Sequence, residues 1–388
     1  MKPMKRQVAL VAIASLASLL LGACASSAGG GGTTGVTQGG GIQGQNLSGV
    51  KFAFAIPTSA ASVYVTQSKL FVDQAEKLGA TVTIYDNNGD AATMLSNAQL
   101  MVAAKPDVIV EYPSAANATD RVGQIFGNAN IPCIALNVPV KGCSFFNFDQ
   151  PALAAMGAEA MAKQMKDRGW DSSNTTIVIG QASTLGKSVN IAVTSFYARM
   201  SELVPGMTKV SADNISPSTT SINGAQGLQA DLGLTVDTGF SAMQTALQTV
   251  PKDRNVVVYP VSDDTTQGVI RALESQGRSD KAMVSGYGGE LTGLNAVREG
   301  KIWVTDQIGF FPWWGEFVLA MAVAVHNGVK PPELTAPPQV VVTKDNVDTY
   351  FRPGTADLIK MPALPKDSEY LLKTGILQQF GNVEGATT

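Results

Sequence analysis

The chain has 388 residues and a formal net charge of -3, from 28 lysines and arginines against 31 aspartates and glutamates. A chain of this length can bury more than one core, and its composition, 45% hydrophobic, is that of a globular protein rather than a disordered one. The balanced charge gives no sign of the basic patch that a nucleic-acid-binding protein needs.

The N-terminal stretch has the pattern of a secretion signal. Lys2, Lys5 and Arg6 precede an apolar run over 8–20, which is shorter than the roughly 20 apolar residues of a membrane span. Leu21-Gly-Ala-Cys24 follows at once and resembles the lipobox of bacterial lipoproteins, in which the cysteine becomes the lipidated first residue. The alternative is an ordinary signal peptide with an incidental cysteine. We predict a signal peptide over 1–23 and an extracytoplasmic protein anchored to the cell membrane through Cys24.

Residues 24–48 form the next predicted segment, which is rich in glycine, serine and threonine. Such a chain cannot bury enough apolar surface to offset the entropy lost on ordering. We therefore expect a flexible tether between the lipid and the folded body.

Two cysteines remain after Cys24. Cys133 and Cys143 are an even pair in an oxidising compartment, near two predicted strands, so a disulfide is plausible. Two buried thiols are the alternative. With these two cysteines and a single histidine, His326, the sequence predicts no metal site and no cofactor.

Strands and helices alternate along the first part of the folded chain. The run Lys51–Ile56, ended by Pro57, is typical of a strand covered on both faces. The further elements expected here are helices over 68–78, 92–104 and 117–129 and strands over 82–85, 107–112 and 132–136. This alternation predicts a parallel sheet with helices on both faces.

The same alternation starts again after a boundary near 149–151. We expect helices over 151–168, 187–203, 265–276, 291–299 and 313–326, and strands over 176–180, 255–259, 282–285 and 302–307. The stretch 211–237, rich in serine, threonine, asparagine and glycine, is predicted to be a long irregular insertion. The fold class is therefore α/β, with two doubly wound parallel-sheet lobes.

Polar and aromatic side chains follow the ends of these strands. In open α/β sheets ligands bind beyond the carboxyl ends of the strands. Hydroxyl, amide and carboxylate groups can satisfy the hydroxyls of a sugar, while aromatic faces cover its C–H faces. The candidate ligand-binding residues are Tyr64, Ser114, Asn137, Gln181, Asn190, Ser262, Asp263, Tyr287, Gln307, Trp313 and Trp314.

Five segments over some three hundred residues resemble the ribose/galactose-type (type I) solute-binding proteins of sugar ABC transporters. They lie at 50–57, 129–137, 262–273, 286–289 and 300–307. The resemblance implies a three-strand hinge and a ligand clamped between lobes that rotate near Asp149, Gly309 and Pro337. The N-terminal lobe is expected over 49–150 plus 309–336, and the C-terminal lobe over 151–308 plus 337–376.

The family's binding residues match this sequence only in part. Tyr64 corresponds to the first-loop aromatic residue and Gln307 to a glutamine near the last crossing. Where the family has charged or amide groups, this chain differs at Asn137, followed by Val138, and at Asn190, Ser262 and Gly288. Because several charged sugar clamps are replaced by neutral groups, a polyol or modified sugar is expected rather than an ordinary aldopentose or aldohexose.

For several of these residues a structural role is the alternative to ligand binding. Within Phe310-Phe-Pro-Trp-Trp314 at least one tryptophan is expected to form an aromatic wall against the ligand, and core packing is the alternative. Asp263 could instead cap the helix starting near Thr265, a role for which Asp264 competes. Tyr64 could be a buried core ring.

Other motifs do not carry a function. The stretch 86–90 looks like a calcium loop but lacks the distal glutamate that such a loop requires. Lys187 is not preceded by the glycine spacing of a phosphate-binding loop. No nucleophile motif points to an enzyme. A soluble repressor is excluded by the signal peptide. We predict a monomeric binding protein that delivers its ligand to an ABC permease. A nucleoside or furanose signal as ligand, or a ligand-presenting sensor subunit, stays open as an alternative.

Overall fold

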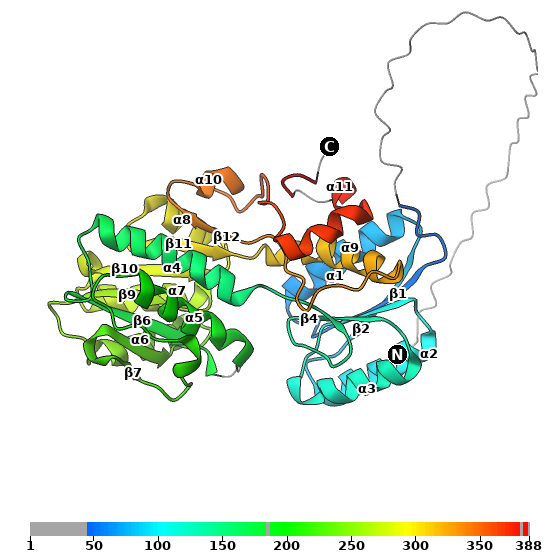
Figure 1. Cartoon of the computed structure of the whole chain (residues 1–388), viewed down its shortest axis with the longest axis horizontal. Helices are drawn as coiled ribbons and strands as arrows, with labels where there is room; N and C mark the ends of the chain where they lie inside the picture. Colours follow the sequence, from blue (N-terminus) through cyan, green and yellow to red (C-terminus); the bar gives the residue numbers. More distant parts are fainter. Residues whose placement is uncertain (1–44, 184–186, 381–382, 387–388) are drawn as a thin grey trace, which may run out of the picture. The chain divides into compact units, whose positions relative to one another are not determined.

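Two mainly parallel sheets organise the chain in the computed structural model, which describes residues 45–183, 187–380 and 383–386 (Figure 1). The predicted signal peptide, Cys24 and most of the predicted tether lie outside these residues. The predicted fold class of two α/β lobes is confirmed. Within the described ranges, no helix combines the length and the apolar character that a membrane crossing requires.

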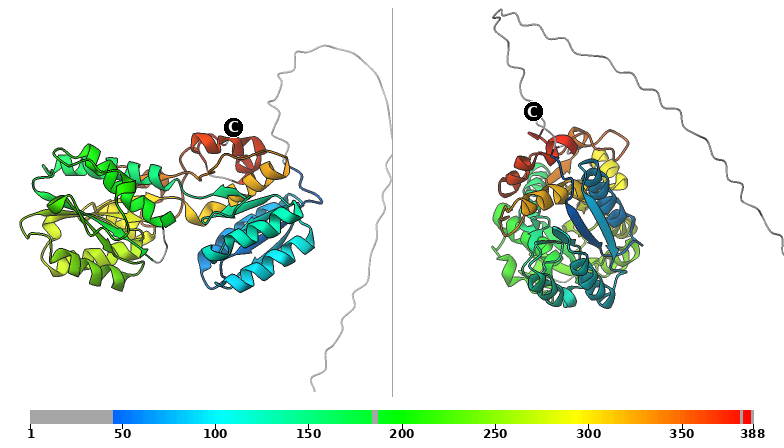
Figure 2. Two further views of the ribbon diagram at one scale, coloured as in Figure 1. Left: turned by 60° about the horizontal axis from the view of Figure 1, so that its bottom comes forward. Right: turned by 90° about the vertical axis from the view of Figure 1, so that its right-hand side faces the viewer.

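The N-terminal lobe is built on a parallel sheet of order β2-β1-β3-β4-β5. Along β1, Phe52 and Phe54 pack on the side of α1 and α9, while Ala53 and Ala55 pack on the side of α2 and α3. The ribbon in Figure 2 shows helices on both sides of this sheet. The element bounds are β1 (Lys51–Ile56), α1 (Ser62–Lys77), β2 (Thr81–Asp86), α2 (Ala91–Ala104), β3 (Val108–Glu111), α3 (Thr119–Ala129), β4 (Cys133–Leu136), β5 (Ser144–Phe146) and α9 (Trp314–His326).

The C-terminal lobe is built on a sheet of order β12-β11-β10-β9-β6-β8-β7, in which only the two edge strands run antiparallel. Helices α4 and α5 cover one face, and α6 and α7 cover the other. The bounds are α4 (Gln150–Asp167), β6 (Thr175–Gln181), α5 (Lys187–Leu203), β7 (Ser221–Ile222), β8 (Gly227–Asp231), α6 (Val236–Leu247), β9 (Asn255–Tyr259), α7 (Asp263–Ser275), β10 (Ala282–Tyr287), α8 (Leu291–Glu299), β11 (Trp303–Ile308) and β12 (Val340–Thr343).

The stretch 211–237 is not an irregular insertion, as the sequence predicted. It contains the edge hairpin β7–β8 and the start of α6, and β8 pairs with β6 over its whole length. The strand was missed because Gly227-Leu-Gln-Ala-Asp231 lies near the edge of the sheet, where a continuous apolar run is not required. Tyr197 packs so closely against Gly227 that a Cβ there would lie 2.3 Å from the tyrosine ring.

The chain passes between the lobes at several places. The first three passages are at 147–149, 309–313 and 327–339, close to the predicted segments. After β12 the chain contacts α8 through α10 (Val347–Tyr350) and then returns to α9 through η7 (Lys366–Thr374) and α11 (Ile376–Phe380).

The return of the chain to α9 differs from the prediction, which placed all of 337–376 in the C-terminal lobe. Leu371, Ile376 and Leu377 are fully buried, and both η7 and α11 contact α9, so this segment packs against the N-terminal lobe. Apolar residues after the last predicted helix could not be assigned to either lobe from their spacing alone.

A disulfide joins Cys133, the first residue of β4, to Cys143, just before β5. The two strands pair in register from Ile134 and Ser144 onward, which brings the two cysteines level with each other. The bond closes the loop that carries Asn137, a candidate ligand residue. Of the two alternatives that the sequence left open, the structure has the bonded one.

Loss of this bond should lower the stability of the folded chain. Replacing Cys133 and Cys143 by serine frees a loop with a sequence separation of 10, and closing a loop of about this size contributes about 2–3 kcal/mol in the chain-entropy model. Urea denaturation should show this loss in the unfolding free energy, and dithiothreitol should destabilise the natural protein but not the double serine variant. An equal response of both proteins to the reductant would contradict the expectation.

Candidate functional site

The predicted ligand residues lie at the carboxyl ends of strands in both sheets. In the N-terminal sheet, Tyr64 follows β1, Ser114 follows β3 and Asn137 follows β4. In the C-terminal sheet, Gln181 ends β6 and Tyr287 ends β10. This is the edge at which open parallel sheets bind ligands.

A continuous row of aromatic rings links these two edges. We call Tyr64, Tyr112, Phe311, Phe148 and Tyr287 the aromatic row. In space the rings follow one another in the order Tyr112, Tyr64, Phe311, Phe148, Tyr287. The centroids of successive rings are 5.0, 6.4, 5.8 and 6.3 Å apart. Four of the five rings are partly exposed, and Tyr112 is buried. The row therefore presents an apolar, ring-lined surface that runs from α1 to the end of β10.

Trp314 supports the row from behind. Its ring is fully buried, lies 4.6 Å from Phe148 and 4.7 Å from Phe311, and its Nε1 donates to the Gly309 carbonyl oxygen at 3.2 Å. Trp313 is half-buried and contacts Phe310 instead. The partly exposed rings beside Trp314 are thus Phe148 and Phe311, which sequence reasoning did not select as ligand residues.

Two close approaches hold the row in place. A Cβ on Gly309 would lie 1.7 Å from Cε1 of Phe148, so only glycine leaves room for this ring. Gln67, buried in α1, donates from Nε2 to the Phe311 carbonyl oxygen at 2.6 Å and ties the short helix η6 (Phe311–Trp313) to α1. Gly309 is the feature of the sequence that could have indicated where the Phe148 ring lies.

Polar groups surround the row at the N-terminal edge. Asn137 adopts a left-handed conformation with φ of 63°, and its carbonyl oxygen accepts from Asn147 Nδ2 at 3.3 Å. Its side chain is half-buried and forms none of the hydrogen bonds found in the described part. The Ser114 hydroxyl donates to the Asp90 carbonyl oxygen.

Two buried carboxyl groups lie in the N-terminal lobe. Glu111 ends β3 and accepts from Asn87 Nδ2 at 2.9 Å, while Glu316 of α9 bonds to Gln74 of α1. Burial raises the pKa of each to about 8, against an ordinary value of 4.5. Both are therefore mostly neutral in the folded protein at pH 7.

These carboxyls should make the protein less stable as pH rises. A raised pKa means that the folded state keeps protons which the unfolded chain releases above about pH 4.5, so this stability is complete in acid and is lost toward and through pH 8. The variant Glu316→Gln stays neutral and should flatten the fall in unfolding free energy between pH 5 and pH 9. Exposed Glu299→Gln is the control and should keep the natural slope. Identical slopes for all three proteins would contradict this account.

The predicted residues from β6 and α5 make internal contacts. Asn190 accepts through Oδ1 from the Ala182 backbone N–H at 3.1 Å, and Gln181 donates through Nε2 to the Pro217 carbonyl oxygen at 2.9 Å. The other amide atom of Gln181, the buried Oε1, has no hydrogen-bond partner among the described residues. Neither residue touches the aromatic row in the contacts found.

Gln307 lies inside the C-terminal lobe rather than at its surface. It is fully buried, and its Oε1 accepts from the Tyr259 hydroxyl at 2.7 Å. A Cβ on Gly157 of α4 would come within 2.5 Å of Nε2. The amide is therefore packed between β11 and α4, one residue before the end of its strand.

At the start of α7, the residue that caps the helix differs from the two aspartates considered in the sequence analysis. Ser262 caps the helix by accepting from the Thr265 backbone N–H at 3.1 Å, so neither Asp263 nor Asp264 is the cap. Asp263 is 2% exposed and accepts three backbone N–H groups of the loop after β10. Tyr287, the first of these donors, also gives its hydroxyl proton to Gln150 Oε1 at 2.7 Å.

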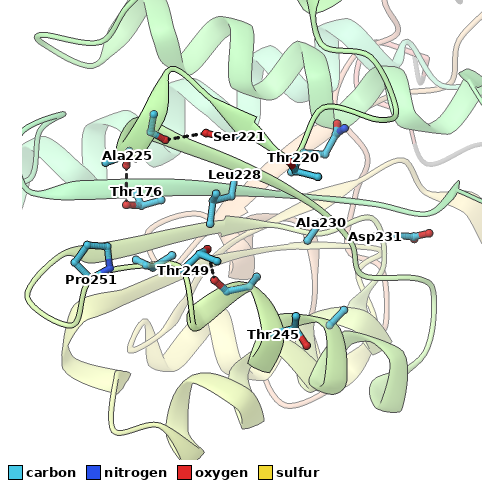
Figure 3. Close-up of a pocket in the computed structure, with 15 residues that line it drawn as sticks. Thr176, Thr220, Ser221, Ala225, Leu228, Ala230, Asp231, Thr245, Thr249 and Pro251 are labelled. Carbon is cyan, nitrogen blue, oxygen red and sulfur yellow. Dashed lines mark hydrogen bonds between the residues drawn. The ribbon is translucent and has the colours of Figure 1, made fainter.

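A cavity of about 740 Å³ lies elsewhere, between the β7–β8 hairpin and α6 (Figure 3). None of the predicted ligand residues lines it. Its Thr176, Ser221 and Thr249 hydroxyls donate to backbone carbonyl oxygens, and its other walls include Leu228 and Pro251. These three hydroxyls therefore keep only their acceptor capacity for a ligand.

Two doubly wound lobes, with aromatic and amide groups at the carboxyl edges of both sheets, define a two-lobed solute-binding protein. The family model for the periplasmic binding protein domain matches residues 52–328, and the chain belongs to this family. Family membership places the protein outside the cytoplasm. Within the described ranges, no group of three histidine, cysteine, aspartate or glutamate side chains is arranged to hold a metal ion.

Curated relatives and solved structures carry the same fold. The chain is 23% identical over 254 residues to the D-xylose-binding periplasmic protein of Escherichia coli, covering 65% of this chain and 70% of that one. It is 25% identical over 272 residues to the ribose import binding protein of the same organism, covering 66% and 82%. A solute-binding protein of Bacillus halodurans with bound myo-inositol aligns with a TM-score of 0.60 at 18% identity, covering 78% of this chain and 98% of that structure.

Proposed function

We propose that this protein is the solute-binding subunit of an ABC importer and that it captures a neutral sugar or polyol at the carboxyl edges of its two sheets. The observation that carries the proposal is the aromatic row, which runs from one edge to the other. Ring faces can pack against the C–H faces of a sugar or polyol. A purely aliphatic ligand could also stack on the rings, but it would leave the hydroxyl groups of the site without hydrogen-bond partners.

Free polar groups beside the row complete the proposed site. The Tyr112 hydroxyl, which belongs to the row, is buried without a hydrogen-bond partner among the described residues, and Asn137 offers a half-buried amide. Buried polar groups are rarely left unpaired, so these atoms are suited to ligand hydroxyls. None of the predicted ligand residues is a lysine or an arginine, which favours an uncharged ligand over a phosphate or a carboxylate.

The names of the relatives support the same class of ligand. They describe binding of D-xylose, ribose and, in the solved structure, myo-inositol. In this chain the lobes would close on the ligand by changes in the backbone of the crossing segments near Asp149 and Gly309. The permease of the importer is the expected partner of the closed form, and the binding protein itself is proposed to act as a monomer.

A thermal-shift panel tests the proposed ligand class. D-xylose, D-ribose, D-allose, allitol and myo-inositol are added to the purified protein, with glucose 6-phosphate as a charged comparison and adenosine for the nucleoside alternative. A ligand at 100 times its Kd adds about 2.7 kcal/mol to the unfolding free energy and raises Tm. At least one neutral sugar or polyol should raise Tm, and glucose 6-phosphate should not. If adenosine alone raised Tm, the proposed ligand class would be wrong and a nucleoside would take its place.

We also propose that Cys24 carries a lipid that holds the protein at the cell membrane. The support is the sequence pattern of the first 24 residues, which lie outside the described part of the chain. In a bacterial host, the natural protein should fractionate with membranes, and Cys24→Ser should appear in the soluble extracytoplasmic fraction. Equal membrane association of both proteins would show that another feature holds the chain there.

A further inference from the structure

The loop after β10 is held by a single carboxylate. We call Tyr287–Glu290 the turn loop. Asp263 Oδ1 accepts from the Tyr287 N–H at 2.8 Å, and Oδ2 accepts from Gly289 at 3.0 Å and from Glu290 at 2.8 Å. The remaining N–H, that of Gly288, donates to the Gln307 carbonyl oxygen at 3.0 Å. All four backbone donors of the loop are therefore engaged by groups beneath it.

A second carboxyl group lies against the first. Asp306 of β11 is fully buried, and neither of its carboxyl oxygens has a hydrogen-bond partner among the described residues. A Cβ on Gly293 of α8 would lie 2.8 Å from Asp306 Oδ2 and 3.0 Å from Asp263 Oδ2, so both carboxyls face one point. The register shift between β10 and β11 after Val284 places Asp306 on the face of β11 that α8 covers.

We propose that Asp263 and Asp306 share one proton and together position the turn loop, so that loss of this proton loosens one wall of the ligand site. The proposal rests on the function proposed above. In the shared state, protonated Asp306 donates an O–H···O bond to the Asp263 carboxylate, and Asp263 keeps its three backbone donors. When both groups are charged, the two carboxylates repel each other in a buried place, where water screens their charges little.

The electrostatic surroundings favour the shared proton. Burial raises the pKa of Asp263 above its ordinary value, and burial together with the nearby Asp263 charge raises the pKa of Asp306 well above its ordinary value. Glu290 on the turn loop is the other titratable group acting on the pair, and its own pKa is raised by burial and by Asp264. No lysine or arginine of the described residues forms an ion pair with either carboxyl.

This arrangement makes Asp263 a positioning residue rather than a direct ligand contact. Its oxygens are occupied and the side chain is 2% exposed, while Gly288 and Glu290 of the turn loop are exposed. A Cβ on Gly288 would lie 2.8 Å from Asp263 Oδ2. Glycine at this position lets the loop lie directly on the carboxylate.

Hydrogen–deuterium exchange of the turn loop tests the pair without any ligand. Exchange of a peptic peptide covering 286–292 is followed from pH 5 to pH 9 after correction for intrinsic rates, in the natural protein and in the variants Asp263→Asn and Asp306→Asn. The amide of Asp306→Asn can donate permanently to Asp263, so this variant imitates the shared-proton state. Asp263→Asn replaces an accepting oxygen by a donor that opposes the loop N–H groups.

The expected results separate the two carboxyls. Protection of the loop should fall by on the order of tenfold in the natural protein as pH rises, stay high at every pH in Asp306→Asn, and be lost at every pH in Asp263→Asn. Glu316→Gln, a buried carboxyl replaced in the other lobe, is the matched control and should follow the natural profile. If Asp306→Asn keeps the natural pH profile, the shared proton is refuted, whether or not Asp263→Asn folds.

Ligand titrations form the second arm. D-xylose, D-ribose and myo-inositol are titrated into the natural protein and Asp306→Asn at pH 6 and pH 9. For whichever of them binds, affinity should fall with pH in the natural protein and should not fall in Asp306→Asn; a parallel fall in both proteins would overturn the link between the pair and the site. If none binds while the exchange results hold, the pair stands and the proposed ligand class fails.

Discussion

Replacing Phe311 by alanine should weaken ligand binding by about 30-fold, which corresponds to about 2 kcal/mol. The Phe311 ring is partly exposed at the middle of the aromatic row and contacts both Tyr64 and Phe148. Its removal takes away a stacking surface for the ligand and also leaves both neighbouring rings without support. Isothermal titration calorimetry measures the change, with whichever of D-xylose, D-ribose and myo-inositol raises the Tm of the natural protein.

Phe240→Ala is the matched control for this substitution. Phe240 is a half-buried phenylalanine of α6 that packs under Arg271, and it has no contact with the aromatic row. Its loss should cost some stability and leave the Kd unchanged. If both variants bind as the natural protein does, the row is a packing feature and the proposed site lies elsewhere.

Replacing Gly309 by alanine should lower the unfolding free energy by about 1–3 kcal/mol and weaken ligand binding as well. The new Cβ would lie 1.7 Å from Cε1 of Phe148, so the ring, the backbone or both must move, and overpacking of this kind costs energy in that range. Urea denaturation gives the stability change, and the near-ultraviolet circular dichroism spectrum should change because Phe148 packs on Trp314.

Gly127→Ala provides the comparison for the same chemical change. Gly127 lies in α3, and no atom lies within 4 Å of the position that its Cβ would take. Alanine there should leave the protein equally stable or more stable by about 0.5–1 kcal/mol, since alanine favours a helix interior. An unchanged urea midpoint for Gly309→Ala, with Gly127→Ala behaving as expected, would show that the Phe148 position is not constrained by Gly309.

The lobes could be predicted because buried parallel strands leave a strong pattern. Runs such as Lys51–Ile56 are nearly continuous in apolar residues, and the helices between them end at proline or glycine. Strand β8 and the C-terminal return to α9 lack this signal. The first is a short strand of the edge hairpin, and the second depends on a long-range contact that no local spacing encodes.

The candidate site could be predicted as an edge of the sheets but not as a set of contacts. Tyr64 and Tyr287 do join the aromatic row, whereas Phe148, which follows β5 just before the predicted boundary at 149–151, was not selected. Gln307 and Asp263 have the right residue types at the right strand ends. The Gln307 side chain faces inward toward Tyr259, because β11 is covered by α4 on that face. Asp263, at the start of α7, accepts from the backbone of the turn loop.

The most direct test of the account is calorimetric titration of the natural protein and of Phe311→Ala with the neutral compounds D-xylose, D-ribose, D-allose, allitol and myo-inositol. The account predicts saturable one-to-one binding of at least one of them by the natural protein and about 30-fold weaker binding by the variant. Saturable binding with the same Kd in both proteins, or no binding of any of these compounds by the natural protein, would contradict it.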